Sequence, residues 1–298
     1  MSSVTYIIYF LLGTVVGSFL NVIALRYKLG EKLLTASVAW GRSRCPDCKT
    51  QLRWYELVPV VSFIIQGGKC RTCKKRLAFQ YPVVELLTGF IFLFVPIRLL
   101  DVYNIWNVVA SGRAVLFFWL VVIWLISLSV LLLILLIDLR LLVIPDQLNL
   151  LLGALGIAVI IVQFAYHAFG MIEGSFIGYH ALLFGFRGNI LVNHIIGALI
   201  GGIVFGLIAI IGRGRAMGWG DVKLITVLGL LFGWPDILII MFLAFVIGAL
   251  VSLVILITKK RTLKDVIPFG PFITIAAAIV FFGGVSLMSG YFSLFGII

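Results

Sequence analysis

Two aspartates stand where long apolar runs meet polar segments. Asp138 closes one such run, and Asp221 follows Gly218 and Gly220 in the short motif Gly-Trp-Gly-Asp. A carboxylate in or beside a membrane helix is costly to desolvate, which makes it a functional-site candidate by default. Two of them predict paired acid and base chemistry. The two glycines remove side chains beside Asp221, so an extended peptide can come close to this segment.

Three neighbouring charges bear on this assignment. Asp146 follows a proline and is typical of the first turn of a helix, so we favour Asp138 as the partner of Asp221. An ion pair with Arg140 is the alternative, purely structural explanation of Asp138. Lys223 is expected either to orient or balance the acids, or to extend toward water from the end of its helix.

All four cysteines lie in the one long polar segment, residues 26–80, as two Cys-x-x-Cys pairs: Cys45 with Cys48, and Cys70 with Cys73. Each pair supplies two thiolates from one tight turn, and two pairs complete a closed four-sulfur site. We therefore expect a structural Zn²⁺ with no open position at which water is activated. Disulfides and free buried cysteines are the competing interpretations, and a reducing compartment argues against the disulfides.

The composition is that of a polytopic membrane protein, because 63% of the 298 residues are hydrophobic and only 11% are charged. A spanning helix needs roughly 20 apolar residues. About eight runs qualify, the sixth of them short: 4–25, 82–100, 114–137, 148–166, 190–212, 221–234, 236–258 and 267–290. The expected fold is therefore all-α. It comprises a first transmembrane helix (1–25), a small zinc-ribbon-like domain (26–80) and a larger transmembrane domain (81–298) that carries both aspartates.

The net charge of +12 is explained by topology. Of the 23 Lys and Arg residues, 20 fall on one set of alternate connections, including the loop 259–264. The positive-inside rule then places residues 26–80 and both motif aspartates at the cytoplasmic face, with the N-terminus outside. The basic residues around the cysteines form either a solvated face or a surface against anionic lipid. A nucleic-acid partner is not required.

Three further features have a weaker meaning. The outer connection 166–193 contributes histidines whose spacing fits no compact metal site. Gly197 and Gly201 are spaced for close helix packing. Glu85, near the start of the second span, is equally well explained by a structural and by a catalytic role.

Taken together, the motifs resemble those of one family, the bacterial type IV prepilin peptidases, which are bifunctional leader peptidases and N-methyltransferases among the GxGD intramembrane aspartic proteases. The matching segments are Gly17 to Val22, Arg42 to Cys48, Trp54 to Glu56, Cys70 to Cys73, Tyr81 to Glu85, Ile137 to Asp146, Gly218 to Lys223 and Pro268 to Pro271. They follow the family's order over nearly the whole chain. The one departure is the connection 166–193, which is longer than in typical members.

The resemblance implies that Asp138 and Asp221 form the catalytic pair, supported by Gly218, Gly220 and Lys223. It also implies that the four cysteines bind zinc. The implied substrates are type IV prepilins or pseudopilins of pilus or type II secretion systems, cleaved at the cytoplasmic face of a bacterial inner membrane. S-adenosyl-L-methionine is the implied methyl donor.

Three alternatives remain at this level. The chain has no glycine-rich Rossmann fingerprint, so methylation rests on the resemblance and on the expected zinc domain, and a peptidase without methyltransferase activity is the first alternative. A proton-coupled transporter would also use intramembrane carboxylates. A membrane scaffold bearing a zinc ribbon would leave the paired acids and glycines without a role.

Overall fold

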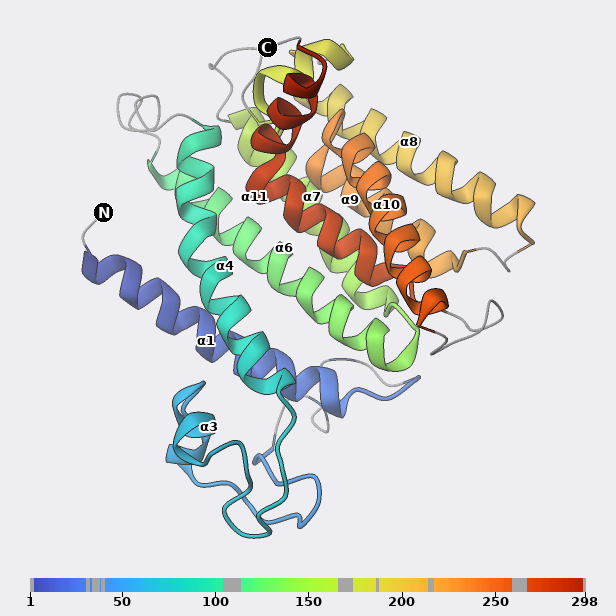
Figure 1. Cartoon of the computed structure of the whole chain (residues 1–298). Helices are drawn as coiled ribbons and strands as arrows, with labels where there is room; N and C mark the ends of the chain where they lie inside the picture. The colour runs from blue at the N-terminus through green and yellow to red at the C-terminus, as the bar shows by residue number, and fades with distance from the viewer. Residues whose placement is uncertain are drawn as a thin grey trace. The chain divides into compact units, whose positions relative to one another are not determined.

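The computed structural model describes residues 3–30, 33, 38, 41–103, 114–165, 174–185, 188–213, 217–258 and 267–296. In that part of the chain the fold is helical, with two isolated β-bridges (Figure 1). The elements are α1 (Ser3–Arg26), η1 (Trp54–Leu57), α3 (Val61–Ile65), α4 (Gln80–Val102), α6 (Ala114–Leu141), α7 (Asp146–Ala165), η2 (Gly178–Phe184), α8 (Ile190–Ile211), α9 (Trp219–Phe232), α10 (Asp236–Ile257) and α11 (Gly270–Leu294). The chain divides into two compact units, Met1–Ile97 and Arg98–Ile298.

The expected all-α membrane fold is confirmed. Within the described residues, seven helices are long and apolar enough to cross a membrane, and the sixth expected run, 221–234, forms the 14-residue helix α9. At 1.5 Å per residue α9 is about 21 Å long, shorter than the roughly 30 Å hydrocarbon layer. The basic loop 259–264 and residues 166–173 of the outer connection lie outside the described residues.

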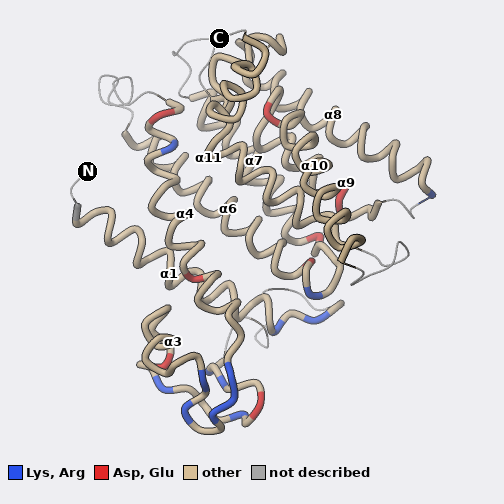
Figure 2. Tube along the Cα trace, viewed as in Figure 1, with Lys and Arg blue, Asp and Glu red and all other residues tan. Residues whose placement is uncertain are grey.

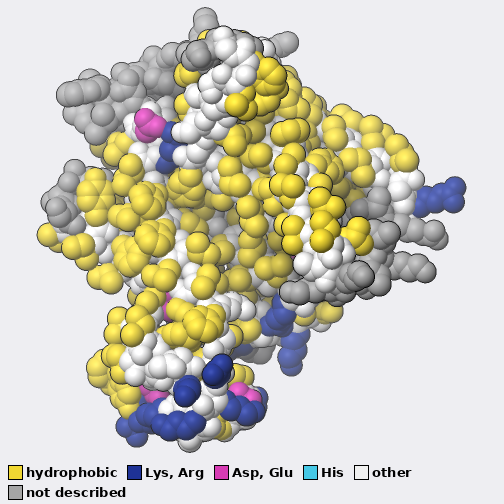
Figure 3. Space-filling view, viewed as in Figure 1, with side chains coloured by type: hydrophobic (Ala, Val, Ile, Leu, Met, Phe, Trp, Pro, Cys, Tyr) yellow, Lys and Arg dark blue, Asp and Glu magenta, His cyan; other side chains and the backbone are white. Residues whose placement is uncertain are grey.

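The outer surfaces of the helices are apolar, as a lipid environment requires. Figure 3 shows hydrophobic side chains over most of the visible helical surface, while Figure 2 shows the basic residues gathered in the segment between α1 and α4. Helix α6 is apolar on all sides and is the most enclosed of the spans. This distribution agrees with a multi-pass membrane protein.

In the first unit, α1 and α4 cross at small residues. A Cβ atom added to Gly13 would lie 2.5 Å from the carbonyl oxygen of Thr88, and one added to Gly17 would lie 2.8 Å from the Cα of Glu85. Glycine at these positions lets the two backbones approach closely, which is how helices associate without a hydrophobic driving force between them.

In the second unit, α9 is held against α8 by a glycine contact. A Cβ on Gly197 would lie 2.6 Å from the carbonyl oxygen of Gly229, and a Cβ on Gly229 would lie 2.3 Å from that of Gly197. Gly201 faces the backbone of Ile225 in the same way, at 3.0 Å. The close packing predicted from Gly197 and Gly201 is confirmed, and it fixes the position of the helix that carries Asp221.

The described part of the outer connection is fastened by a fully buried carboxylate that sequence analysis did not single out. Asp236, at the start of α10, accepts hydrogen bonds from the hydroxyl of Ser175 at 2.8 Å and from the backbone N–H of Phe176 at 2.9 Å. Arg98 donates to the carbonyls of Phe176 and Phe281, each at 3.0 Å. These bonds satisfy buried polar groups and tie the connection to the bundle.

Candidate active site, metal centre and cavity

Asp138 lies in the last turn of α6, with 4% of its surface exposed. Its carboxylate accepts a hydrogen bond from the backbone N–H of Gly270, the first residue of α11. The first turn of a helix offers N–H groups without intrahelical partners and a partial positive charge, so it stabilises a negative charge placed there.

Asp221 lies in the first turn of α9, with 9% of its surface exposed. Its carboxylate accepts a hydrogen bond from the backbone of Gly218, and it is close enough to Asp138 for the two to repel each other electrostatically. The structure therefore brings together the two aspartates that the sequence predicts as a pair.

Ile144, in the connection between α6 and α7, packs between the two helix starts. A Cβ on Gly220 would lie 3.4 Å from the Cβ of Ile144. A Cβ on Gly270 would lie 2.5 Å from Oδ2 of Asp138 and 3.1 Å from Cδ1 of Ile144. Leu142 in the same connection has a left-handed φ of 56°, a conformation that costs energy for a branched residue and recurs at functional sites. Glycines at 220 and 270 thus permit the close approach around the acids.

Lys223 and Asp146, the two other charged residues considered for this site, bond to each other. Nζ of Lys223 donates to Oδ1 of Asp146 at 2.8 Å, and the two side chains are 53% and 71% exposed. An exposed pair of this kind contributes about 0–1 kcal/mol. The pair links the first turns of α7 and α9 at the surface, whereas Asp138 and Asp221 are buried.

The two Cys-x-x-Cys segments adopt the same turn. The N–H of Lys49 donates to the carbonyl of Cys45 at 3.0 Å, and that of Lys74 donates to the carbonyl of Cys70 at 2.9 Å. Lys49 and Lys74 both have left-handed φ angles, 60° and 58°. Each turn is closed by one antiparallel bridge, Arg44 to Gln51 and Lys69 to Arg76. We refer to residues 43–52 and 68–77 as the two knuckles.

The four thiols converge from both knuckles. All four Sγ atoms lie within 4.8 Å of one another, with 3.9 Å between those of Cys45 and Cys73 and 4.0 Å between those of Cys48 and Cys70. Tetrahedral coordination with 2.3 Å zinc–sulfur bonds implies about 3.8 Å between sulfurs, whereas a disulfide requires about 2.05 Å. The spacing fits a shared metal ion.

Local hydrogen bonds favour the ligand form of two of these thiols. The Thr50 hydroxyl and backbone lower the pKa of Cys48 to about 6. The backbone N–H groups of Cys73 and Thr72 likewise lower the pKa of Cys70. The thiolate is the species that binds metal, so these hydrogen bonds favour the ligand form at Cys48 and Cys70. Cys73 differs: the backbone of Lys75 lowers its pKa, but burial and the three other thiols outweigh this and raise it to about 11.

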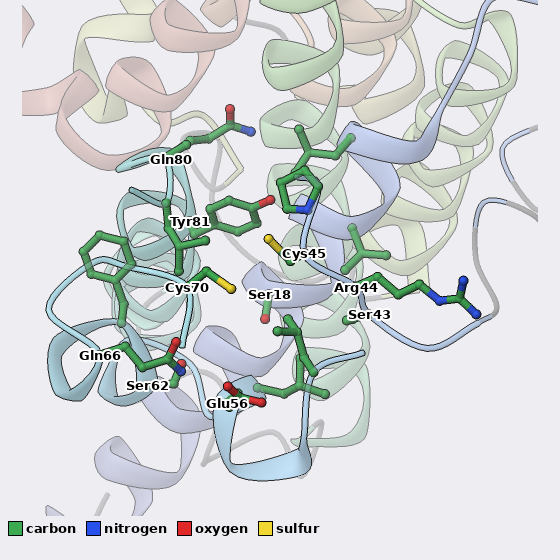
Figure 4. A pocket seen from close by; sticks show the side chains of 18 of the residues that line it. Ser18, Ser43, Arg44, Cys45, Glu56, Ser62, Gln66, Cys70, Gln80 and Tyr81 are labelled. Atoms are coloured by element: carbon green, nitrogen blue, oxygen red, sulfur yellow. The ribbon is translucent and has the colours of Figure 1, made fainter. Parts of the chain in front are cut away.

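A cavity of about 910 Å³ lies in the first unit, and Figure 4 shows side chains that line it, Ser18 of α1, Gln66 and Tyr81 among them. Its wall is formed by the second half of α1, both knuckles, the segment around α3 and the first turns of α4. Glu56 and Glu85 contribute carboxylates, and several arginines contribute positive charge. Nothing in the local spacing of the sequence indicates this cavity.

Two further residues of the second unit were given no role from the sequence. Gly270 belongs to a Pro-Phe-Gly-Pro motif that marked only the start of the last span, yet its backbone contacts Asp138. Asn149 is a buried amide three residues after Asp146. A polar residue inside an apolar run was the available signal for Asn149.

The fold and these sites define a multi-pass membrane protein with two buried aspartates close to each other and a cluster of four cysteines that could hold a metal ion. Residues 11–99 match the bacterial peptidase A24 N-terminal domain, and residues 120–253 match the type IV leader peptidase family. The chain belongs to the type IV leader peptidase family, in agreement with the resemblance read from its motifs.

Curated relatives align over nearly the full chain, and each carries the name prepilin leader peptidase/N-methyltransferase. The relative from Pseudomonas aeruginosa is 29% identical over 96% of this chain and 93% of its own length. The relative from Bacillus subtilis is 27% identical, covering 95% of this chain and 96% of its own. One from Burkholderia pseudomallei is 30% identical, over 91% and 84% respectively. No solved structure matches the chain.

Substituting Gly270 tests whether the close approach at Asp138 matters. We expect Gly270→Ala to leave the protein folded but to reduce peptide cleavage, because the new methyl group would lie 2.5 Å from Oδ2 of Asp138. Displacing a reacting group by about 1 Å can reduce the rate on the order of a hundredfold. Gly283→Ala in the same helix is the matched control, since a Cβ there has no neighbour within 4 Å. Full activity of Gly270→Ala would contradict this account.

Metal analysis tests the four-cysteine centre. We expect the purified chain to contain one zinc ion, and Cys45→Ser or Cys70→Ser to lose it, because each removes a thiolate from a closed site. Elemental analysis of the intact chain is the measurement. Thr72→Ala, between two of the cysteines, should retain the metal. Stoichiometric zinc in both serine variants would show that the ion is bound elsewhere.

Proposed function

We propose that the chain cleaves the leader peptide from type IV prepilins or pseudopilins with Asp138 and Asp221, and then methylates the newly exposed N-terminal amine. The observation that carries the proposal is the electrostatic contact between these two buried carboxylates, each supported by a backbone donor at the start of a helix. The names of the curated relatives support the choice of substrate and the second activity.

In the proposed cleavage, the ionised carboxylate removes a proton from water, and the water oxygen attacks the scissile carbonyl carbon. The protonated carboxylate donates its proton to the carbonyl oxygen. When the tetrahedral intermediate collapses, the carbon–nitrogen bond breaks and the amine leaves with a proton returned by the pair. Asp138 and Asp221 thus share the acid and base roles in a coupled site.

When bound, S-adenosyl-L-methionine would supply a methyl group to the neutral α-amine of the mature pilin, leaving a neutral thioether as its product and releasing the amine proton to water. The 910 Å³ cavity of the first unit, with carboxylates and arginines on its wall, is of a size and chemistry that fit such a donor.

We further propose that the four cysteines hold a structural Zn²⁺. Four thiolates fill its coordination sphere, so the ion would stabilise the knuckles and would not activate water. The excess of Lys and Arg in this segment supports placing it, and the aspartates, at the cytoplasmic face of a bacterial inner membrane. These positive charges also suit contact with anionic lipid.

Two alternatives make different predictions. A peptidase without methyltransferase activity would yield mature pilin with an unmodified N-terminal amine, which the mass of the product distinguishes. A proton-coupled transporter would need carboxylates along a path through the bilayer. Asp138 is in the last turn of α6 and Asp221 in the first turn of α9, so the pair sits at one end of these helices.

Cleavage of a purified prepilin by aspartate variants tests the assignment. Asp138→Asn and Asp221→Asn should each reduce the cleavage rate by roughly 10²–10⁴, the usual contribution of acid–base groups. Asp146→Asn is the control: it breaks only an exposed pair worth about 0–1 kcal/mol and should cleave like the wild type. Each variant must be folded and metal-loaded. If Asp146→Asn is inactive and Asp138→Asn is active, the catalytic partner of Asp221 is Asp146 and not Asp138.

A further inference from the structure

One carboxylate on the wall of the first unit's cavity has no ion pair within the described part of the chain. Glu85 lines the cavity and is 6% exposed. Its Oε2 accepts the backbone N–H of Val60 at 2.7 Å, and the Ser18 hydroxyl also donates to it. Among the described residues, no Lys or Arg side chain forms an ion pair with Glu85.

Glu56, the other carboxylate of the cavity, differs in this respect. It is 8% exposed, accepts the N–H of Arg53 at 2.8 Å and lies 3.4 Å from Nε of Arg71. A buried charge without an opposite charge is unfavourable and attracts a cation that can enter. The surroundings of Glu85 therefore favour a positively charged group beside it, whereas the basic side chains elsewhere on the wall favour a negatively charged group of the same ligand.

We propose that this cavity is the binding site of the methyl donor and that Glu85 lies beside its sulfonium group. The inference rests on the proposed N-methyltransferase activity and names the site that this activity requires. A volume of about 910 Å³ is within the roughly 300–1,000 Å³ of small-molecule sites. Tyr81 and Phe63 on the wall provide aromatic surface for a purine. The arginines, among them Arg42, provide donors for the α-carboxylate of the ligand.

Glu85→Gln provides a sharp test because it removes the charge while keeping an acceptor for Val60 and Ser18. Binding of S-adenosyl-L-methionine and of its neutral thioether product is measured by calorimetry on the full chain in lipid nanodiscs. We expect the affinity for the cationic donor to fall at least about tenfold, and that for the neutral product to change little, since one charge interaction is lost. Asp47→Asn, in an exposed pair with Lys75, is the control and should bind both ligands like the wild type.

Equal affinity of Glu85→Gln and wild type for the donor overturns the inference. If the wild type methylates pilin in that case, the proposed function stands and the donor binds elsewhere. If the wild type neither binds the donor nor methylates pilin, the proposed second activity itself fails. An equal loss for both ligands indicates a collapsed cavity and also counts against a charge-specific role.

A separate observation concerns Asn149 of α7 in the second unit. It is 5% exposed, and neither its amide nitrogen nor its carbonyl oxygen has a hydrogen-bond partner within the described structure. Leaving a buried polar group unpaired costs about 1–3 kcal/mol. An unpaired amide of this kind inside a membrane protein is a candidate for contact with a ligand.

The register of α7 against α9 places Asn149 at the level of the acid pair. The helices run parallel, because Asp146 bonds to Lys223, a Cβ on Gly153 would contact Val227, and one on Gly156 would contact Leu230. Asn149, Gly153 and Gly156 are spaced i, i+4 and i+7, so they share the face toward α9. Side chains lean toward the start of their helix, which directs Asn149 toward the first turn of α9.

We infer that Asn149 binds the main chain of the peptide being cleaved, its carboxamide donating to one backbone carbonyl and accepting from one backbone N–H. This inference deepens the proposed peptidase function and makes Asn149 a substrate-positioning residue. A carboxamide matches a peptide group in having both a donor and an acceptor. An extended substrate beside the aspartates would satisfy both atoms at once.

Asn149→Leu separates this role from a structural one, because leucine has a similar size and no polar atoms. We expect unchanged or higher thermal stability. KM for prepilin should rise about tenfold because two hydrogen bonds to the substrate are lost, while kcat should stay within about twofold. Gly153→Ala on the same face is the control and should leave KM unchanged. If Asn149→Leu has the KM of the wild type, and cleavage still depends on Asp138 and Asp221, the inference about Asn149 is wrong and the proposed peptidase function stands.

Discussion

The burial of two neighbouring carboxylates is the constraint on which the second unit depends. Each carboxylate is removed from water, so each needs a hydrogen-bond donor that is not already bonded to another group in the protein. The first turns of α9 and α11 supply them through Gly218 and Gly270, since the first N–H groups of a helix have no intrahelical partner. Two helix starts must therefore meet the last turn of α6, and the surrounding chain is arranged to allow this.

Close helix contacts make that meeting possible. Gly197 of α8 and Gly229 of α9 allow backbones to touch, which leaves α9 little freedom to shift along its neighbour. Helix α9 has only 14 residues and is shorter than the hydrocarbon layer of a membrane, so Asp221 lies on the shortest of the long apolar runs that the structure describes.

The first unit is organised around different chemistry. The two knuckles adopt the same turn, and each is closed by a single antiparallel β-bridge, so no regular sheet is needed. Together they bring four Sγ atoms within 4.8 Å of one another, close enough to share a metal ion. The cavity beside them contains a buried carboxylate with no ion pair among the described residues, a property that a metal-stabilised fold alone does not require. The two family models divide the chain in nearly the same way: one matches residues 11–99, close to the first unit, and the other matches residues 120–253, within the second unit.

The sequence by itself determined the helices and singled out the two aspartates and the four cysteines that the fold brings close together, because apolar run length and the spacing of Cys-x-x-Cys and Gly-x-Gly-Asp are local properties. It also indicated the α8 glycines. The contact of Gly270 with Asp138, 132 residues away in the chain (270 − 138), was decided only by the tertiary structure. Tertiary structure likewise decided that, among the described residues, the amide of Asn149 has no hydrogen-bond partner and Glu85 has no ion pair. Whether a polar group has a partner depends on which distant helix packs against it, and local spacing does not encode that.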